Sequence, residues 1–494
     1  MNKILVANRG EIAMRIMRTC KDMKIKTVAV YSEADRTSPH VRFADEAVCI
    51  GPPASKDSYL RGDKIIEVAK TLGVEGIHPG YGFLSENAEF ADQVINSGIR
   101  FIGPSAHAMN LMGDKLSAKN TVKEFNVPLV PGVNHSVEDI EEAHRIALEI
   151  GFPVLVKASA GGGGKGMRVV EREEDLKEQL ERAVSEATSA FGNGAVFIER
   201  YVAKPRHIEI QIMADNHGNV VYLFERECSI QRRHQKVIEE APSVVLTPEL
   251  RKEMGEAAVS VSKSCNYSGA GTVEFLYEEG KFYFLEMNTR LQVEHPVTEM
   301  ITGIDLVREQ INVARGEKLS FTQDDLKIHG HALEVRVYAE DPANNFLPDT
   351  GSLVTYKTPK GTGVRVDDGF VEGMDIPVYY DPMLAKLVTY GSNRKEAIQR
   401  MVRAIDEYEI TGVKTTLGFC RYAIQHEAFV SGDFDTQFVK KYFTAENLNR
   451  KTTEQEELGA LLAVQLLQKK LTSNVYSSIN QNASSSWRNN RSIK

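Results

Sequence analysis

The sequence predicts a protein of mixed α/β and α+β class, built from three domains and a tail. Three features predict it: strands and helices alternate at the start of the chain, strands flank a glycine-dense segment, and apolar and polar residues alternate over long later stretches. The chain has 494 residues, 42% of them apolar, which is enough for several hydrophobic cores. We expect domains at 1–113, 114–330 and 331–446, followed by a tail at 447–494.

Composition and charge exclude several classes of protein. Sixty Lys and Arg residues against 68 Asp and Glu residues give a net charge of −8, which argues against a broad nucleic-acid-binding surface. No apolar run approaches the roughly 18 residues of a membrane span, and the N-terminus lacks the apolar core of a signal peptide. The five cysteines are scattered, without a C-x-x-C pair. We therefore expect a cytoplasmic protein that binds neither nucleic acid nor membrane.

The first domain opens on the segment KILVANRGEIAMRIMRTCKDMKIKTVAVYSEAD, residues 3–35. It predicts a short buried strand, a glycine turn, a helix with apolar residues at Ile12, Ile16 and Met17, and a second buried strand. The strand-like runs EGIHPG and IRFIGP follow, separated by helical segments. Together they predict an open parallel sheet that extends to about residue 113.

A compact section over 131–203 is expected to form a lid within the second domain. It contains KASAGGGGKGMRVVE, residues 157–171, in which five glycines occupy six positions. A dinucleotide fingerprint requires a helix after the glycines, and a Walker A loop requires Ser or Thr after the lysine. Here strands flank both sides, and Gly166 follows Lys165. Two interpretations remain: a hairpin whose tip closes over phosphates, and a merely flexible hairpin. Lys157 in the preceding strand favours the first.

One strand of the second domain has a continuous polar face. In RHIEIQIMAD, residues 206–215, isoleucines alternate with His207, Glu209 and Gln211. The three polar side chains therefore project from the same side of the strand. An ordinary half-exposed strand has the same pattern, so the segment alone leaves both interpretations open.

A later hairpin places two carboxylates opposite each other. If residues 279–281 form the loop of TVEFLYEEGKFYFLEMN, Glu274 and Glu286 face each other on neighbouring strands. Like charges across a strand pair are destabilising, and a divalent cation such as Mg²⁺ removes the conflict by binding the carboxylate oxygens. The hairpin therefore favours a metal site over a surface hairpin.

The chain continues from this hairpin as EMNTRLQVEHP, with a polar residue at every second position until Pro296. If the chain stays extended, five side chains project together: Glu286, Asn288, Arg290, Gln292 and Glu294. An arginine in this position suits a small oxyanion, and the last glutamate suits a base beside it.

Two basic features carry weaker signals. The loop QRRHQK, residues 231–236, concentrates positive charge, which suits either an anion site or an ordinary basic surface loop. Arg336 lies in the strand HALEVRVYAED and shares a face with Glu334 and Tyr338. Taken alone, Arg336 is interpreted as a surface arginine rather than a catalytic one.

Six segments resemble those of biotin carboxylase, a member of the ATP-grasp superfamily. In chain order they are ILVANRGEIA, IHPGYGFLSEN, KASAGGGGKGMRVV, KPRHIEIQ, ECSIQRRHQKVIEEAP and EMNTRLQVEHPVTEMITG. The resemblance covers residues 1 to about 446. It implies a three-domain ATP-grasp enzyme with a Rossmann-like N-terminal domain, a central ATP-grasp domain with a mobile lid, and a mixed C-terminal domain.

The resemblance also implies the site residues. Those for ATP are Lys115, Lys157, Gly163, Gly164, Glu199, Arg200, Tyr201, Val202, His207, Gln231, His234, Glu274 and Glu286. Those for the metal, Mg²⁺ or Mn²⁺, are Glu274, Glu286 and Asn288. Those for bicarbonate are Lys236, Arg290, Gln292, Val293 and Glu294, and those for biotin are Tyr81, Gly82 and Arg336. The implied catalytic residues are Lys236, Arg290, Glu294 and Arg336.

The implied reaction carboxylates biotin on a separate carrier protein, with ATP and bicarbonate as the other substrates. It is the first half-reaction of an acetyl-CoA or propionyl-CoA carboxylase. The sequence contains no Ala-Met-Lys-Met-type biotinylation site. The implied partners are therefore a biotin carboxyl carrier protein and a carboxyltransferase, together with a second copy of the chain in a homodimer.

Several alternatives stay open at this point. The chain suits the corresponding subunit of a two-subunit pyruvate carboxylase, another ATP-grasp ligase, or a non-catalytic nucleotide-binding regulator. The tail is expected to form a helix with Leu458, Leu461 and Leu462 on one face, followed by a flexible Ser/Asn-rich end. This tail suits either a docking element for a partner or a disordered terminus.

Overall fold

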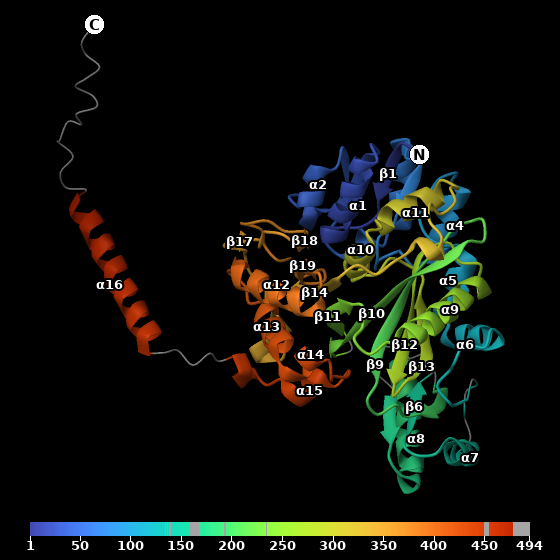
Figure 1. The fold of residues 1–494 in the computed structure, drawn as a ribbon. Helices are drawn as coiled ribbons and strands as arrows, with labels where there is room; N and C mark the ends of the chain where they lie inside the picture. The colour runs from blue at the N-terminus through green and yellow to red at the C-terminus, as the bar shows by residue number, and fades with distance from the viewer. Residues whose placement is uncertain are drawn as a thin grey trace. The chain divides into compact units, whose positions relative to one another are not determined.

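The computed structural model describes residues 1–133, 135, 137, 140–158, 167–191, 194–233, 235–448 and 454–477. The chain divides into two units, Met1–Thr444 and Ala445–Lys494, and each is described by itself (Figure 1). The first unit combines a parallel sheet with antiparallel sheets and helices, which confirms the predicted fold class.

A five-stranded parallel sheet forms the N-terminal part of the first unit. Its order is β3-β2-β1-β4-β5, with β1 at Lys3–Val6, β2 at Lys26–Ser32, β3 at Glu46–Gly51, β4 at Gly76–His78 and β5 at Arg100–Phe101. The longer connecting helices are α1 at Gly10–Asp22, α3 at Gly62–Thr71 and α4 at Ala88–Asn96. Gly10 starts α1 with a φ of +64°, a conformation that glycine adopts without strain. The predicted open parallel sheet is confirmed.

An eight-stranded antiparallel sheet supports the rest of the first unit. Its order is β13-β12-β9-β10-β11-β14-β19-β18. The strands are β9 at Arg206–Ala214, β10 at Val220–Arg232, β11 at Gln235–Ala241, β12 at Gly269–Glu278, β13 at Lys281–Asn288, β14 at His331–Tyr338, β18 at Val364–Asp368 and β19 at Met383–Gly391. Because β11 pairs with β14, the sheet continues across residue 330, where the sequence predicts a domain limit.

A three-stranded sheet with two helices forms the lid section. Its order is β7-β6-β8, with β6 at Val154–Ala158, β7 at Met167–Val170 and β8 at Val196–Arg200. The helices are α7 at Ile140–Ile150 and α8 at Leu176–Phe191. Lys157 on β6 pairs with Met167 on β7, so strands flank the glycine segment on both sides, as predicted. Residues 159–166 lie outside the described part of the chain.

Further short elements surround these sheets. The helices are α2 at Pro39–Phe43, α5 at Ala106–Gly113, α6 at Lys115–Glu124, α9 at Pro248–Ser264, α10 at His295–Thr302, α11 at Leu306–Ala314, α12 at Arg394–Glu407, α13 at Leu417–Gln425, α14 at Glu427–Ser431 and α15 at Phe438–Tyr442. The strands are β15 at Glu340–Asp341, β16 at Leu347–Pro348, β17 at Thr355–Lys357 and β20 at Glu409–Thr411.

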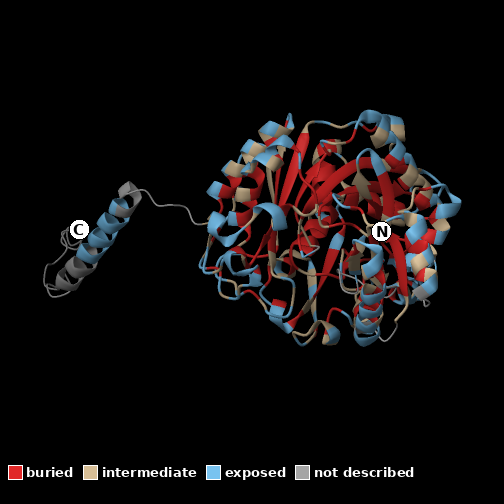
Figure 2. Ribbon diagram, turned by 90° about the horizontal axis from the view of Figure 1, so that it is seen from below, coloured by how far each residue is buried: buried red, intermediate tan, exposed pale blue. Residues whose placement is uncertain are grey.

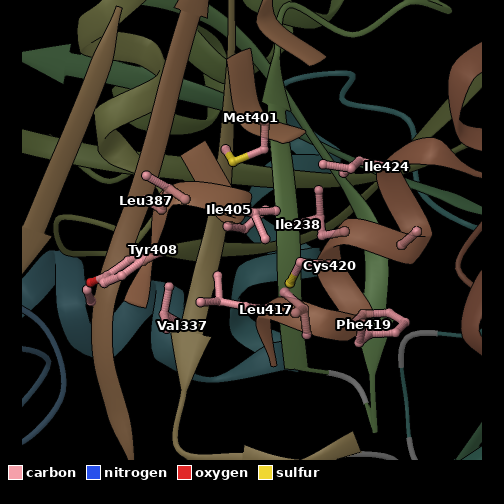
Figure 3. Close-up of a cluster of buried hydrophobic side chains, with 14 of the residues drawn as sticks. Ile238, Val337, Leu387, Met401, Ile405, Tyr408, Leu417, Phe419, Cys420 and Ile424 are labelled. Carbon is pink, nitrogen blue, oxygen red and sulfur yellow. The ribbon is translucent and has the colours of Figure 1, made fainter. Parts of the chain in front are cut away.

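A hydrophobic core on one face of the large sheet decides which way the polar residues point. Ile238 on β11, Val337 on β14 and Leu387 on β19 pack with side chains of α12 and α13 (Figure 3). Neighbouring residues of a strand project to opposite faces. Residues 239, 336 and 386 therefore project from the face of the sheet that turns away from this core.

The second unit contains the helix α16 at Glu454–Ser477. Its described side chains, including Leu458, Leu461 and Leu462, are exposed, whereas the strands of the first unit are largely buried (Figure 2). The predicted tail helix is confirmed, and the Ser/Asn-rich end at 478–494 lies outside the described residues. No helix in the described residues is both long and apolar enough to cross a membrane.

Candidate active site

A cleft of about 1480 Å³ gathers most of the predicted site residues in the first unit. It is lined by the loops after β1 and β4, by lid strands β6 and β8, and by the large sheet. The predicted residues that line it are Tyr81, Gly82, Lys115, Lys157, Glu199, Arg200, Tyr201, Val202, His207, Gln231, Lys236, Glu274, Glu286, Asn288, Arg290, Gln292, Val293 and Arg336. Gly163, Gly164 and His234 lie outside the described residues.

A row of charged side chains crosses the floor of this cleft. Pairing of the strands places Glu286 opposite Glu274, Glu274 opposite Glu209, and Glu209 opposite Arg226. The alternation predicted for β9 is therefore correct, but the strand is buried on both faces rather than half-exposed. The pairing predicted for Glu274 and Glu286 is confirmed, but the loop expected at 279–281 is wrong, because Glu278 pairs with Lys281 and a bulge between Glu274 and Phe275 shifts the register by one residue. Three neighbouring glutamates repel one another and destabilise the sheet unless nearby cations offset their charge.

Lys236 supplies one of these cations and contacts three carboxylates at once. Its Nζ donates to Glu209 Oε2 at 2.5 Å, to Glu274 Oε1 at 2.7 Å and to Glu294 Oε1 at 2.7 Å. Burial opposes the charged form, but the three carboxylates outweigh it and hold the pKa of Lys236 well above its usual value. A fully charged lysine at this point can also attract a small anion from the cleft.

Glu294 lies buried between two cations, directly below the cleft. Its Oε1 accepts from Lys236, and its Oε2 accepts from Arg336 Nη2 at 3.0 Å. Burial alone would raise the pKa of Glu294, but Lys236 and Arg336 hold it well below its usual range. The interpretation of Arg336 as a surface arginine is wrong, because the residue is 7% exposed. Glu294 itself is fully buried and is not among the residues that line the cleft, whereas Lys236 and Arg336 are. A substrate in the cleft can therefore share these two donors with an ionised carboxylate that lies behind them.

Glu239 anchors Arg336 from the opposite side. Arg336 Nε donates to Glu239 Oε1 at 2.6 Å, and Glu239 faces Glu334 across the β11–β14 pair. Both glutamates are fully buried, and neither oxygen of Glu334 has a hydrogen-bond partner among the described residues. Burial raises the pKa of Glu239 to about 7 and raises that of Glu334 well above its usual value. The guanidinium is thus fixed between Glu239 and Glu294.

Glu274 and Glu286 fit a divalent cation. Burial, followed by the charge of Glu274, raises the pKa of Glu286. Asn288 Nδ2 lies 2.9 Å from Glu274 Oε1, so the amide belongs to the same group of oxygen-bearing side chains. His207 Nε2 lies 2.9 Å from Glu274 Oε2. Two adjacent carboxylates whose repulsion is only partly offset are suitable ligands for Mg²⁺ or Mn²⁺.

The lid side of the cleft holds a second charged group. Glu199 on β8 accepts from Lys157 Nζ at 2.5 Å, and Lys119 on α6 forms a further short contact with the same carboxylate. Burial alone would raise the pKa of Glu199, but the two lysines lower it. Val202 is buried just after this strand. This edge therefore combines two cations with an apolar surface, as a nucleotide requires.

Arg290 projects into the cleft although the strand ends before it. The prediction of an extended run to Pro296 is wrong, because β13 ends at Asn288 and turns follow. Arg290 Nη2 still donates to Asn288 Oδ1 at 3.0 Å, and its Nη1 donates to Gln292 Oε1 at 3.1 Å. Glu86 accepts from its Nε at 2.8 Å. These contacts keep the guanidinium beside the carboxylate cluster.

The sequence did not predict three residues of the charged cluster, namely Glu209, Arg226 and Glu239. Arg226, which is fully buried, donates to Glu209 Oε1 at 2.5 Å and to Gln211 Oε1 at 2.6 Å. The polar face of β9 pointed to Glu209, but the turn after β9 did not point to Arg226, because a bulge between Tyr222 and Glu225 shifts the register and brings Arg226 opposite Glu209. Glu239 had no comparable signal, because its partner Arg336 is 97 residues away.

Comparison with known proteins decides the family. A biotin carboxylase N-terminal domain model matches residues 1–109, a carbamoyl-phosphate synthase L chain ATP-binding domain model matches 114–322, and a biotin carboxylase C-terminal domain model matches 334–441. Biotin carboxylase 1 of Bacillus subtilis is 54% identical over 442 residues, which cover 89% of this chain and 98% of that one. The chain belongs to the biotin carboxylase family.

Relatives in this family carry different full names. A pyruvate carboxylase subunit of Methanothermobacter thermautotrophicus is 55% identical over 89% of this chain and 90% of its own length. The mitochondrial propionyl-CoA carboxylase alpha chain of Sus scrofa is 53% identical over 94% of this chain, but over only 64% of its own length. Sequence identity therefore does not separate these relatives.

Solved structures of the same family have the same fold. The biotin carboxylase domain dimer of the Hydrogenobacter thermophilus 2-oxoglutarate carboxylase, in complex with MgADP, ADP and bicarbonate, matches with a TM-score of 0.85 and 47% identity. The match covers 91% of this chain and 99% of that one. The structure of a biotin carboxylase–β-γ-ATP complex from Campylobacter jejuni has a TM-score of 0.85 and 45% identity, and the match covers 89% of this chain and 99% of that one. The three-domain ATP-grasp architecture is thereby confirmed.

Proposed function

We propose that this chain is the biotin carboxylase subunit of an acetyl-CoA or propionyl-CoA carboxylase, and that its cleft activates bicarbonate for transfer to biotin on a carrier protein. ATP-dependent carboxylation of biotin is the activity of the family. The position of Glu294 carries the assignment of the chemistry to particular residues. Its two carboxylate oxygens contact different cations, Lys236 and Arg336, and both of these cations line the large cleft.

ATP is assigned to the side of the cleft near the lid. Lys115 and Lys157 are placed to offset the charge of the phosphates, and Glu199 to Val202 form the edge for the adenine ring. His207 and Gln231 complete this group from β9 and β10. The glycine hairpin, including Gly163 and Gly164, is assigned as the cover that keeps water from a labile intermediate.

Glu274, Glu286 and Asn288 are the residues assigned to Mg²⁺ or Mn²⁺. The paired carboxylates on adjacent strands fit this role, because they are buried together. The bound cation would neutralise phosphate oxygens and favour phosphoryl transfer. His207 and Lys236 already contact Glu274, so they hold this carboxylate in its ionised form.

Glu294 is assigned as the base that activates bicarbonate. A carboxylate held by both Lys236 and Arg336 is a weak base, because its pKa is strongly lowered. Bicarbonate is assigned to Lys236, Arg290, Gln292 and the backbone of Val293. A bicarbonate ion bound there would take part of the hydrogen bonding of Lys236 away from Glu294, which would raise the pKa of Glu294 and make it a stronger base. The proton then moves from bicarbonate to Glu294, and the bicarbonate oxygen attacks the γ-phosphate to form carboxyphosphate and ADP.

Biotin is assigned to the opposite wall, near Tyr81, Gly82 and Arg336. Carboxyphosphate breaks down to CO₂ and phosphate, and the phosphate removes the proton of the ureido nitrogen. That nitrogen attacks CO₂, and the guanidinium of Arg336 stabilises the negative charge that develops on the ureido oxygen. Because Glu239 fixes Arg336, the guanidinium does not have to reorganise during the reaction.

The partners follow from the chemistry of the products. A biotin carboxyl carrier protein must deliver biotin to the cleft, and a carboxyltransferase subunit must use the carboxylated product. We assign a homodimer to the chain, which is supported by the dimeric biotin carboxylase domain of the 2-oxoglutarate carboxylase relative. The five cysteines are unpaired and four are buried, which supports a reducing cytoplasm as the location. The domain limits at 113, 330 and 446, the lid at 131–203 and the tail at 447–494 are proposed as the functional divisions.

A second candidate is the corresponding subunit of a two-subunit pyruvate carboxylase. It is favoured by the 55% identical relative from Methanothermobacter thermautotrophicus, which is named for that enzyme. A silent nucleotide-binding regulator is disfavoured, because Lys236, Glu294 and Arg336 form a connected charged group whose two cations line the cleft.

A test of the proposed activity incubates the purified chain with Mg-ATP, bicarbonate and biotin and measures the release of ADP. We expect release that requires bicarbonate and rises with biotin, whereas release without bicarbonate would refute the assignment. Adding the biotinylated carrier and the cognate carboxyltransferase with acetyl-CoA, propionyl-CoA or pyruvate then identifies the acceptor. Carboxylation of pyruvate alone would replace the first candidate with the second.

A further inference from the structure

The loop between Ile376 and Pro382 exposes two adjacent apolar side chains beside the cleft. Val378 is 71% exposed and Tyr379 is 53% exposed. Tyr379 reaches the edge of the cleft, whereas Val378 lies outside its lining. Exposed apolar side chains that adjoin a binding cleft are candidates for contact with a partner. These two residues are called the rim pair below.

The loop that carries the rim pair is held in place on both sides. The backbone N–H of Ile376 donates to the carbonyl of Gly351, and that of Ala339 donates to the carbonyl of Pro382, both at 2.9 Å. Between these ends, Tyr380 points inward and donates from its hydroxyl to the carbonyl of Pro53 at 2.5 Å. The rim pair is therefore presented on a preorganised surface, which lowers the entropy cost of binding.

A chain of aromatic rings connects the rim pair with the loop assigned to biotin. The ring centroids of Tyr379 and Tyr380 are 6.3 Å apart, and those of Tyr380 and Phe83 are 6.5 Å apart. Phe83 directly follows Gly82, and it stacks on Tyr59 at 4.9 Å. The guanidinium of Arg9 lies 4.2 Å from the centre of the Tyr380 ring and covers it. The apolar rim thus continues directly into the biotin wall of the cleft.

We infer that the rim pair is the docking point for the protein that carries biotin. The surface of this carrier protein contacts Val378 and Tyr379 while its biotin enters the cleft. This inference rests on the proposed function. The carrier must approach along the wall formed by Tyr81 and Gly82, and the rim pair is the exposed end of that wall. Tyrosine is enriched among the few residues that supply most of the binding free energy of an interface, which suits Tyr379. An apolar contact of this size fits a carrier that docks briefly and leaves again.

The test compares two forms of the same substrate. Steady-state rates are measured with free biotin and with a biotinylated carrier protein, for the wild type, Val378→Asp and Tyr379→Ala. We expect kcat/KM for the carrier to fall about 30-fold, which is about 2 kcal/mol at 1.4 kcal/mol per tenfold. We expect kcat/KM for free biotin to change less than about twofold in Val378→Asp, because Val378 lies outside the lining of the cleft and free biotin needs no docking surface. Val354→Asp is the matched control, since Val354 is 67% exposed and does not line the cleft.

Other outcomes overturn the inference. Unchanged kinetics with the carrier would show that the rim pair is not a docking point. An equal loss with free biotin and carrier would assign the loop to the biotin pocket itself. Titration of fluorescently labelled, biotinylated carrier measures docking without turnover, and Val378→Asp must raise its Kd about 30-fold. A wild type that binds the carrier but carboxylates neither form would refute the proposed function and leave the docking result intact.

Discussion

Replacement of Lys236 by Met tests the electrostatic arrangement of the cleft most severely. The Nζ of Lys236 lies within 2.5 to 2.7 Å of carboxylates from Glu209, Glu274 and Glu294. Methionine keeps the length of the side chain and removes the charge. Removing one partner of a buried ion pair costs about 3–5 kcal/mol, because the other partner keeps an uncompensated charge. We expect a loss of stability of that order in the first unit.

The loss must depend on pH in a definite direction. Without Lys236, the three carboxylates repel one another, so their pKa values rise in the folded state. Stability contributed by groups with a raised folded pKa is fully present below the unfolded pKa and is lost as the pH rises through the folded pKa. The deficit relative to the wild type should therefore be greatest near pH 8 and should shrink toward pH 5.

Differential scanning calorimetry of the wild type and Lys236→Met at several pH values measures this deficit. Apparent midpoints are compared, because a chain with several domains does not unfold in one step. Lys252→Met is the control, since Lys252 is 70% exposed in its contact with Glu256. Equal midpoints at pH 8, or a deficit that does not change with pH, would refute the reasoning.

Three further substitutions test individual roles. Glu294→Gln should slow bicarbonate-dependent ADP release about 10²–10⁴-fold, the usual contribution of a general base, while ATP binding measured by calorimetry is retained. Glu286→Gln should raise the Mg²⁺ concentration for half-maximal activity about tenfold or more, because a carboxylate becomes an amide. Glu239→Gln should lower kcat/KM for biotin about tenfold, because Arg336 loses a charged acceptor worth about 1.5–3 kcal/mol, and should change the KM for ATP little.

Each of these has a result that contradicts it. Unchanged ADP release in Glu294→Gln would remove this residue as the base, and an unchanged Mg²⁺ requirement in Glu286→Gln would remove the metal assignment. Glu240→Gln is the control for Glu239→Gln, because Glu240 is the next residue of β11 and pairs with His331 and Arg394 instead. Equal losses for the two variants would indicate general damage to the sheet.

Local patterns predicted much of the cleft. The sequence placed Glu274 and Glu286 opposite each other by assuming a loop at 279–281, and the pairing is correct although the loop is not. Glu278 pairs with Lys281, and a bulge between Glu274 and Phe275, which no local pattern predicted, brings Glu286 opposite Glu274. The same reasoning about alternation identified the polar face of β9. Strands on both sides of the glycine segment excluded a dinucleotide turn, and their pairing through Lys157 and Met167 agrees with that exclusion.

Local sequence patterns could not predict the contacts between strands that are far apart in the chain. Arg336 looked like a surface residue because its strand alternates, yet the large sheet buries it between Glu239 and Glu294. The pairing of β11 with β14 joins segments on either side of residue 330, and no local signal encodes that pairing. The sequence also predicted an extended strand beyond Asn288, where β13 ends. Arg290 still contacts Asn288, because the turns after the strand keep the two side chains on the same side.

Oxygen transfer from bicarbonate to phosphate tests the central claim most directly. If Glu294 activates bicarbonate to attack the γ-phosphate, the phosphate released from ATP must retain one bicarbonate oxygen. With ¹⁸O-labelled bicarbonate, Mg-ATP and biotin, mass spectrometry should therefore find one ¹⁸O atom per phosphate released. Phosphate that carries only oxygen from ATP and water would contradict the account, because water rather than bicarbonate would then be the nucleophile.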